Sequence, residues 1–172
     1  MRKLAVMLLA LALTSCMSTE IRSKKDSAYR ERLTKTAIVS QVQMNLRDDF
    51  GERFASLFEE GLSAGLIARG VEVIVISIDE LGLDARDVDR RIAQFGATTV
   101  LFVTPVGALR DGYTGGVREV RFNLSVGPPA RSSARVWRAS IEFKSGGVIS
   151  VETRAARLAR DIISKLTEDG LL

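Results

Sequence analysis

Few residues of this chain of 172 have side chains suited to catalysis, because it contains no histidine and only one cysteine. Without histidine the chain lacks the usual general base, the commonest metal ligand and any Ser–His or Cys–His pair. Gly61-Leu62-Ser63-Ala64-Gly65 matches the G-x-S-x-G pattern of a hydrolase nucleophile. That pattern needs a sharp strand-to-helix turn and a histidine partner. The surrounding residues have helical spacing, so we interpret the glycines as small residues that let a helix pack closely on the sheet.

Acidic residues between positions 79 and 89 form a second candidate group, which could supply paired carboxylates for acid–base catalysis or calcium binding. They are Asp79, Glu80, Asp84, Asp87 and Asp89. Their order is not that of a calcium loop, and Asp84 or Asp87 is well placed to cap a helix whose dipole favours negative charge. We therefore expect no enzymatic activity, no cofactor and no metal. The alternative is an envelope hydrolase that uses carboxylates or a Ser–Lys pair.

Arginine recurs in the last third of the chain, and its planar guanidinium can bind carboxylates or phosphates through two hydrogen bonds. The candidate partner-binding residues are Arg118, Arg121, Arg135, Trp137 and Arg138. The same trend continues in Arg131, Arg154, Arg157 and Arg160. An acidic protein, peptidoglycan or the phosphates of lipopolysaccharide would suit these arginines. The alternatives are a merely solvated arginine face and a core position for Trp137.

The amino terminus has the composition of an export signal. Arg2 and Lys3 precede ten apolar residues, Leu4 to Leu13. Ten residues of helix span about 15 Å, half the hydrocarbon thickness of a bilayer, so this run is too short to be a membrane anchor. We expect residues 1–15 to be a signal peptide that is removed.

Leu13-Thr14-Ser15-Cys16 resembles the lipobox of bacterial lipoproteins. The resemblance implies cleavage just before Cys16 and attachment of a diacylglycerol to its thiol. It also implies the outer membrane, on the periplasmic side, because Met17 is not the aspartate that retains such proteins in the inner membrane. The inner membrane is the less favoured destination. The alternative is a cysteine that lies near an ordinary signal cleavage site.

The mature chain is close to neutral. Without Arg2 and Lys3, 23 of the 25 basic residues remain against 21 acidic residues. Nucleic-acid binding would require a strongly basic patch, so we do not expect nucleic acid as a partner. Residues 16–36 are polar and rich in lysine and arginine, and we interpret them as a lipidated terminus and flexible tether. Residues 37–172 then form a single globular domain.

Within that domain, the periodicity of apolar residues predicts alternating strands and helices. A strand over 37–39, extended towards Met44, is followed by a helix from Asp48 or Asp49 to Gly70 and by a doubly buried strand over 71–77. A helix over 85–95 and a strand over 98–104 come next. Alternating apolar residues over 120–126 and 137–143 predict an antiparallel pair, and the last helix covers 150–168 with Phe58 at the centre of the core. This is an α+β fold, one mixed sheet of about five strands covered by about three helices, in the order β-α-β-α-β-β-β-α.

This order resembles that of periplasmic lipoprotein domains related to the amino-terminal domain of TolB. The resemblance depends on Gly70-Val71-Glu72-Val73, on Phe95 to Leu101 and on Val136-Trp137-Arg138. Curli-secretion and penicillin-binding-protein-activator lipoproteins belong to this group. It implies a lipid-anchored, non-enzymatic protein that binds or helps to assemble another envelope component. The lipopolysaccharide-assembly lipoprotein of the outer membrane is the alternative, although its pattern has no helix like 85–95.

Overall fold

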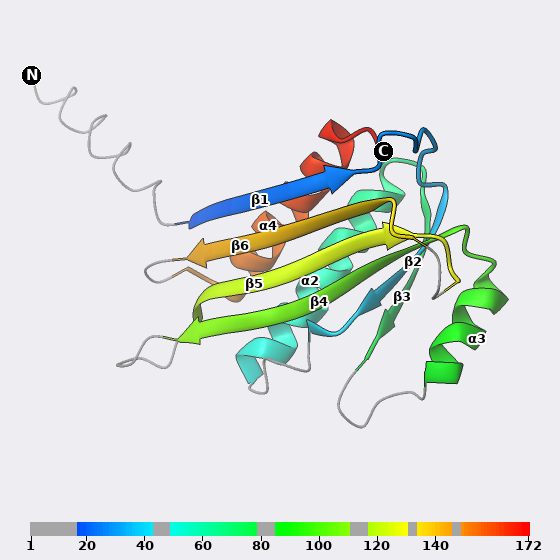
Figure 1. The fold of residues 1–172 in the computed structure, drawn as a ribbon. Coiled ribbons are helices and arrows are strands. Elements are labelled where there is room, and N and C mark those ends of the chain that lie inside the picture. Colours follow the sequence, from blue (N-terminus) through cyan, green and yellow to red (C-terminus); the bar gives the residue numbers. More distant parts are fainter. Residues whose placement is uncertain (1–16, 43–48, 79–84, 111–116, 131–133, 146–148) are drawn as a thin grey trace, which may run out of the picture.

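One mixed β-sheet organises the chain in the computed structural model, which describes residues 17–42, 49–78, 85–110, 117–130, 134–145 and 149–172. The sheet has six strands in the order β1-β6-β5-β4-β2-β3 (Figure 1). The strands are β1 (Met17–Lys25), β2 (Lys35–Ser40), β3 (Glu72–Ser77), β4 (Thr99–Arg110), β5 (Val117–Gly127) and β6 (Trp137–Ser145). The helices of the described residues are α2 (Asp49–Ile67), α3 (Ala85–Phe95) and α4 (Val151–Glu168).

Helices α2 and α4 cover the same face of the sheet (Figure 1). Alternate residues of β5 and β6 point towards these helices, as the period of two in their sequences predicts. Phe58 is fully buried there, with its ring stacked between Phe54 at 6.1 Å and Phe122 at 5.9 Å. The main core therefore lies between the sheet and these two helices, and the central position predicted for Phe58 is confirmed.

The G-x-S-x-G segment lies inside α2 and brings α2 close to α4. A Cβ atom at Gly61 would lie 3.1 Å from Ala159 Cβ, and one at Gly65 would lie 2.7 Å from Ile163 Cγ1. The glycines thus permit close packing, as predicted, but against a helix and not against the sheet. Ser63 sits in the middle of the helix, so it lacks the strand-to-helix turn that a nucleophile of this kind requires.

Helix α3 packs on the opposite face of the sheet, where it covers only the part formed by β2, β3 and the start of β4. Val88 and Ile92 of α3 contact a second cluster that contains Ala37, Val39 and Val100. This cluster belongs to β2, β3 and the first residues of β4. The same face of β1, β6, β5 and the rest of β4 has no helix over it among the described residues.

The α+β class, the single mixed sheet and the three helices are confirmed in the described residues. The order of elements along the chain differs from the prediction by one strand. Strand β1 precedes the predicted series, so the sheet has six strands and not about five. The prediction of a flexible tether over residues 16–36 is wrong for residues 17–25, because these residues pair antiparallel with all of β6. Backbone hydrogen bonds place this charged segment at the sheet edge, with alternate side chains half-buried.

Two other strands differ from the prediction. Strand β3 is the second edge of the sheet and most of its side chains are only half-buried, so it is not the doubly buried strand expected. Strand β4 continues past Pro105 to Arg110. Proline is tolerated there because β2 pairs with β4 only from Thr99 to Val103, so the ladder on that side has already ended.

Candidate binding surface on the open face of the sheet

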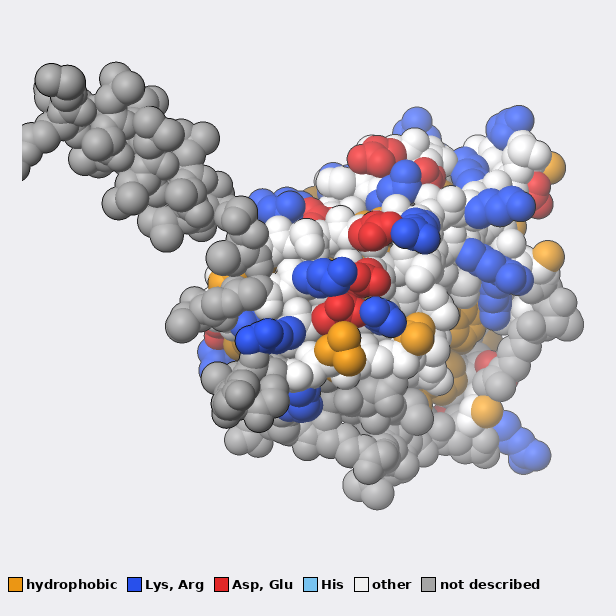
Figure 2. Space-filling model, turned by 60° about the vertical axis from the view of Figure 1, so that its left-hand side comes forward, with side chains coloured by type: hydrophobic (Ala, Val, Ile, Leu, Met, Phe, Trp, Pro, Cys, Tyr) orange, Lys and Arg blue, Asp and Glu red, His pale blue; other side chains and the backbone are white. Residues whose placement is uncertain are grey.

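The uncovered part of the sheet presents polar side chains from four neighbouring strands, and we call it the open face. Because successive side chains of a strand alternate between faces, the polar half of each pattern points away from α2 and α4. The open face comprises Glu20, Arg22, Lys24, Phe102, Thr104, Glu119, Arg121, Asn123, Ser125, Arg138, Ser140, Glu142 and Lys144. Figure 2 shows acidic and basic side chains gathered over this side of the molecule, beside a few hydrophobic ones.

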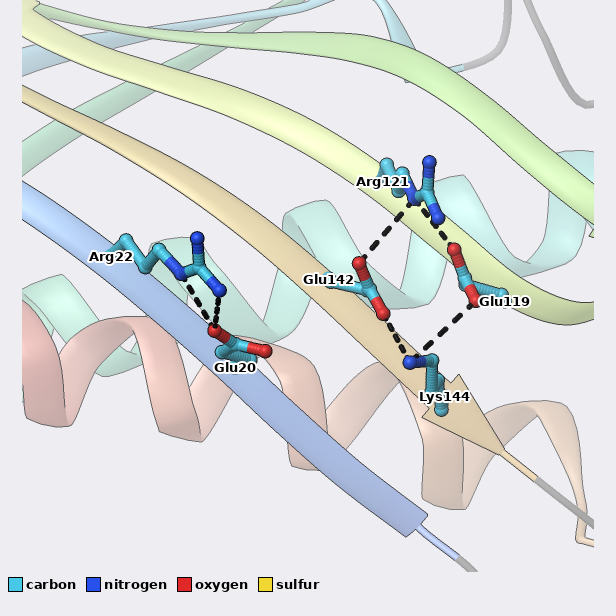
Figure 3. Close-up of polar contacts among 6 residues, drawn as sticks. All are labelled: Glu20, Arg22, Glu119, Arg121, Glu142 and Lys144. Atoms are coloured by element: carbon cyan, nitrogen blue, oxygen red, sulfur yellow. Dashed lines mark hydrogen bonds and ion pairs between the residues drawn. The ribbon is translucent and has the colours of Figure 1, made fainter.

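At the end of the open face near Met17, the charges are paired with one another. The Nε atom of Arg121 lies 2.6 Å from Oε1 of Glu119 and 3.5 Å from Oε2 of Glu142. Lys144 pairs with both glutamates (Figure 3). The hydrogen bond from Lys144 lowers the pKa of Glu142, and the same bond raises the pKa of Lys144. On β1, Arg22 and Glu20 form a separate pair. These charges therefore neutralise each other.

At the opposite end, basic side chains come together and form no ion pairs with the acidic residues that the structure describes. Lys24 of β1 lies directly opposite Arg138 of β6 in the strand register. Within the described residues, neither side chain forms an ion pair or a hydrogen bond. Like charges directly opposite each other on neighbouring strands are destabilising. The sheet therefore holds a local excess of positive charge here.

Arg135 completes this group from the segment before β6. Its guanidinium lies 4.4 Å from the centre of the Phe102 ring, and its Nη1 donates a hydrogen bond to the carbonyl oxygen of Pro128 at 3.4 Å. Contact with an aromatic face is a favourable position for arginine. These contacts hold a cation at the edge of the open face.

The three basic residues surround a hollow of about 680 Å³ that we call the basic pocket. Its lining also includes Arg22, Thr104, Asn123, Ser125 and Ser140. A second hollow of about 480 Å³ shares Lys24, Arg135 and Arg138 with it and is also lined by Asp26. The carboxylate of Asp26 accepts a hydrogen bond from the backbone of Ala28 at 2.9 Å.

The structure separates the five residues predicted to bind a partner. Arg135 and Arg138 lie together in the basic pocket, whereas Arg121 belongs to the paired network and Arg118 lines neither hollow. Trp137 is 1% exposed, so its assignment as a partner-contacting residue is wrong. Its indole Nε1 donates a hydrogen bond to Asp169 Oδ2 at 2.7 Å, on the helix-covered face.

The arginines of the last helix lie on the other side of the sheet. Arg154 is buried and donates a hydrogen bond to the carbonyl oxygen of Val117 at 2.7 Å, and burial lowers its pKa. Arg157 pairs with Asp161 at 2.9 Å. Arg131 lies outside the described residues. The arginine trend in the sequence therefore combines residues from separate surfaces.

The sequence interpretation missed Lys24 and the hydroxyl and amide side chains of the pocket. Lys24 belongs to the segment interpreted as a tether, so no strand was available to place it opposite Arg138. A weak signal existed in the alternation around Ile21, the one large aliphatic side chain of β1 besides Met17. The polar residues Asn123, Ser125 and Ser140 are the exposed half of strands that were predicted correctly.

Catalytic groups do not gather in the described residues. Asp87 pairs with Arg90 at 2.5 Å on α3, and Asp79, Glu80 and Asp84 lie outside the described residues. In the described ranges no group of three or more cysteine or acidic side chains could hold a metal ion. No helix there is both long and apolar enough to cross a membrane.

Comparison with solved structures identifies a similar fold. A PelC dodecamer from Paraburkholderia phytofirmans matches with a TM-score of 0.58 and 21% identity, over 87% of this chain and 97% of that chain. A variant of the same PelC matches with the same TM-score and 20% identity, over 87% and 98% of the two chains. At this identity the likeness concerns the fold. No family model matches this chain, and no curated protein matches it.

Proposed function

We propose that this protein is a lipid-anchored, non-enzymatic protein of the outer membrane that binds another envelope component through the open face of its sheet. The observation that carries the proposal is the cluster of Lys24, Arg135 and Arg138, which surrounds a hollow and forms no ion pair with an acidic residue in the part of the chain that the structure describes. A positive cluster of this kind attracts an anionic group and guides it into register. The partner is therefore an acidic envelope protein, peptidoglycan or lipopolysaccharide. The PelC structures are dodecamers, so further copies of this chain are included among the partners.

The position of β1 fixes how an anchored domain would face its surroundings. Strand β1 begins at Met17, directly after the residue that we expect to carry lipid. A lipid on Cys16 would therefore hold the Met17 end of the sheet at the membrane with little slack. Lys24 lies about 23 Å further along the strand at the usual rise per residue. This geometry favours a partner in the periplasm over the anchoring membrane itself.

Cys16 is expected to be the acylated first residue of the mature protein. Intact-mass analysis of the protein extracted from membranes should show a chain that starts at residue 16 and carries lipid, because two or more acyl chains make membrane attachment stable. Replacement of Cys16 by Ala should leave an unprocessed or unacylated protein. Detection of a wild-type chain cut elsewhere, with a free Cys16 thiol, would remove the anchor from the proposal.

Charge reversal in the basic pocket is expected to weaken partner binding. In the Arg135→Glu/Arg138→Glu variant, in-cell crosslinks from residues 118–138 to the partner should fall at least tenfold, because unlike charges guide such contacts. The matched control is Arg32→Glu/Arg160→Glu, which makes the same charge change at exposed residues outside the pocket. Crosslinks that persist in the first variant, or that disappear equally in the control, would contradict binding at this pocket.

A further inference from the structure

We infer that the basic pocket binds an acidic saccharide, with carboxylates on its basic side chains and hydroxyl groups on its polar floor. This inference rests on the proposed function, since it names the chemical class that the open face recognises. The volume of about 680 Å³ lies in the range of small-molecule sites. Two rows of side chains that cross four strands carry the argument.

The first row supplies negative-charge recognition. It runs from Phe102 of β4 through Ser125 of β5 and Arg138 of β6 to Lys24 of β1, each residue directly opposite the next. Arg135 sits over Phe102 at one end of this row, and Lys24 and Arg138 occupy the other. Arginine matches a carboxylate with two parallel hydrogen bonds. A ligand with carboxylate groups would relieve the repulsion between Lys24 and Arg138.

The second row supplies neutral hydrogen-bonding groups. It runs from Thr104 through Asn123 and Ser140 to Arg22, again with each residue opposite the next. Arg22 is already paired with Glu20, so the groups that this row offers are hydroxyls and an amide. Such groups both donate and accept hydrogen bonds. Sugar hydroxyls need this combination.

The two rows together distinguish a saccharide from other anions. A single phosphate ion bound at the cations is too small to contact the polar row as well, because the two rows are separated by two residues along each strand. An acidic peptide has few hydroxyl groups and would meet the polar row through its backbone amides alone. A neutral sugar would leave Lys24 and Arg138 uncompensated. A saccharide that bears carboxylates uses both rows.

The test is calorimetric titration of the full mature lipoprotein in neutral detergent with four probes: trigalacturonate, maltotriose, triglutamate and inorganic phosphate. We expect trigalacturonate to bind at least tenfold more tightly than each of the others, and its affinity to fall with salt. Equal binding of triglutamate or phosphate would overturn the saccharide assignment in favour of a peptide or a simple anion. Equal binding of maltotriose, or binding of none of the probes, would overturn it as well.

Matched variants locate the binding. Arg138→Gln should weaken trigalacturonate binding at least tenfold, whereas Arg160→Gln removes the same charge from an exposed position on α4 and should change it less than twofold. Asn123→Ala should weaken trigalacturonate and leave phosphate binding unchanged. All three sites are exposed, and thermal melts within 2 °C of wild type would show that folding is retained. A loss of trigalacturonate affinity that is as large in Arg160→Gln as in Arg138→Gln, or larger, would overturn the assignment of the site.

The proposed function and this inference fail in different ways. Charge-sensitive crosslinks without trigalacturonate binding would overturn the saccharide and leave the docking function intact. Two results would overturn the proposed function and leave the pocket assignment intact. They are trigalacturonate binding by a protein that is not acylated, and trigalacturonate binding by a protein whose crosslinks are unchanged by charge reversal.

Discussion

Replacement of Phe58 by Ala is expected to lower the free energy of unfolding by about 3–5 kcal/mol, the usual cost of truncating a buried phenylalanine. Phe58 is fully buried in α2 and its ring stacks on Phe54 and Phe122, so the change removes contacts with both the helix and the sheet. For a chain of this size, thermal unfolding should show a decrease in Tm of about 6–20 °C.

The matched control is Ile67→Ala in the last residue of the same helix. Ile67 is 56% exposed, so its truncation should change the unfolding free energy by less than about 0.5 kcal/mol. Equal effects of the two variants would show that α2 does not pack on the sheet through Phe58.

Replacement of Asp169 by Ala is expected to have the next largest effect, a loss of about 1–3 kcal/mol. The Asp169 carboxylate accepts hydrogen bonds from Ser23 of β1 at 2.6 Å and from Trp137 Nε1 of β6 at 2.7 Å, and it pairs with Lys165 of α4 at 3.1 Å. The alanine variant leaves the indole N–H in the core without its acceptor. Glu168→Ala is the control: Glu168 also pairs with Lys165 but is exposed, so its loss should cost at most about 1 kcal/mol. Chemical denaturation at pH 7 would measure both.

The same carboxylate should make stability depend on acid. Burial raises the pKa of Asp169, but hydrogen bonds from Ser23, Trp137 and Lys165 outweigh it and leave the pKa below its ordinary value. The ionised group thus contributes stability above about pH 4, which is lost as the pH falls through the pKa of the folded state. Asp169→Asn should therefore show a smaller decrease in stability below pH 4 than wild type. If the stability of the two proteins decreased in parallel below pH 4, groups other than Asp169 would be responsible for the acid sensitivity.

The elements that the sequence predicts well are those in which side-chain burial decides the structure. Helix α3 has the predicted bounds because Val88 and Ile92 repeat at helical spacing, and β5 and β6 follow a clear period of two. Strand β1 has only a weak pattern of this kind, since Ile21 is surrounded by charged and hydroxyl side chains. It is held by backbone pairing with β6 and by contacts such as Lys25 Nζ to the carbonyl oxygen of Asp169 at 2.9 Å. Such interactions between segments distant in the chain cannot be identified from the local sequence of β1.

The candidate site shows the same division. Arg135 and Arg138 could be chosen from residue type and position alone. Their separation from Arg121 depends on Glu119 and Glu142, which neutralise Arg121 on the assembled sheet. The burial of Trp137 follows from the parity of β6, in which the even-numbered Arg138 and the odd-numbered Trp137 face opposite sides. Lys24 belongs to the site because β1 pairs with β6 and places it opposite Arg138. That pairing is known only from the assembled sheet.

Site-specific photocrosslinking in living cells is the most direct test that the open face binds an envelope component. A photoreactive residue at Ser140, in the floor of the basic pocket, is compared with one at Ser164, which is exposed on α4 across the sheet. We predict a crosslinked adduct from Ser140 that is lost in the Arg135→Glu/Arg138→Glu variant, and no adduct from Ser164. Adducts from Ser164 alone, or equal adducts from both positions that do not respond to charge reversal, would contradict the proposed binding surface.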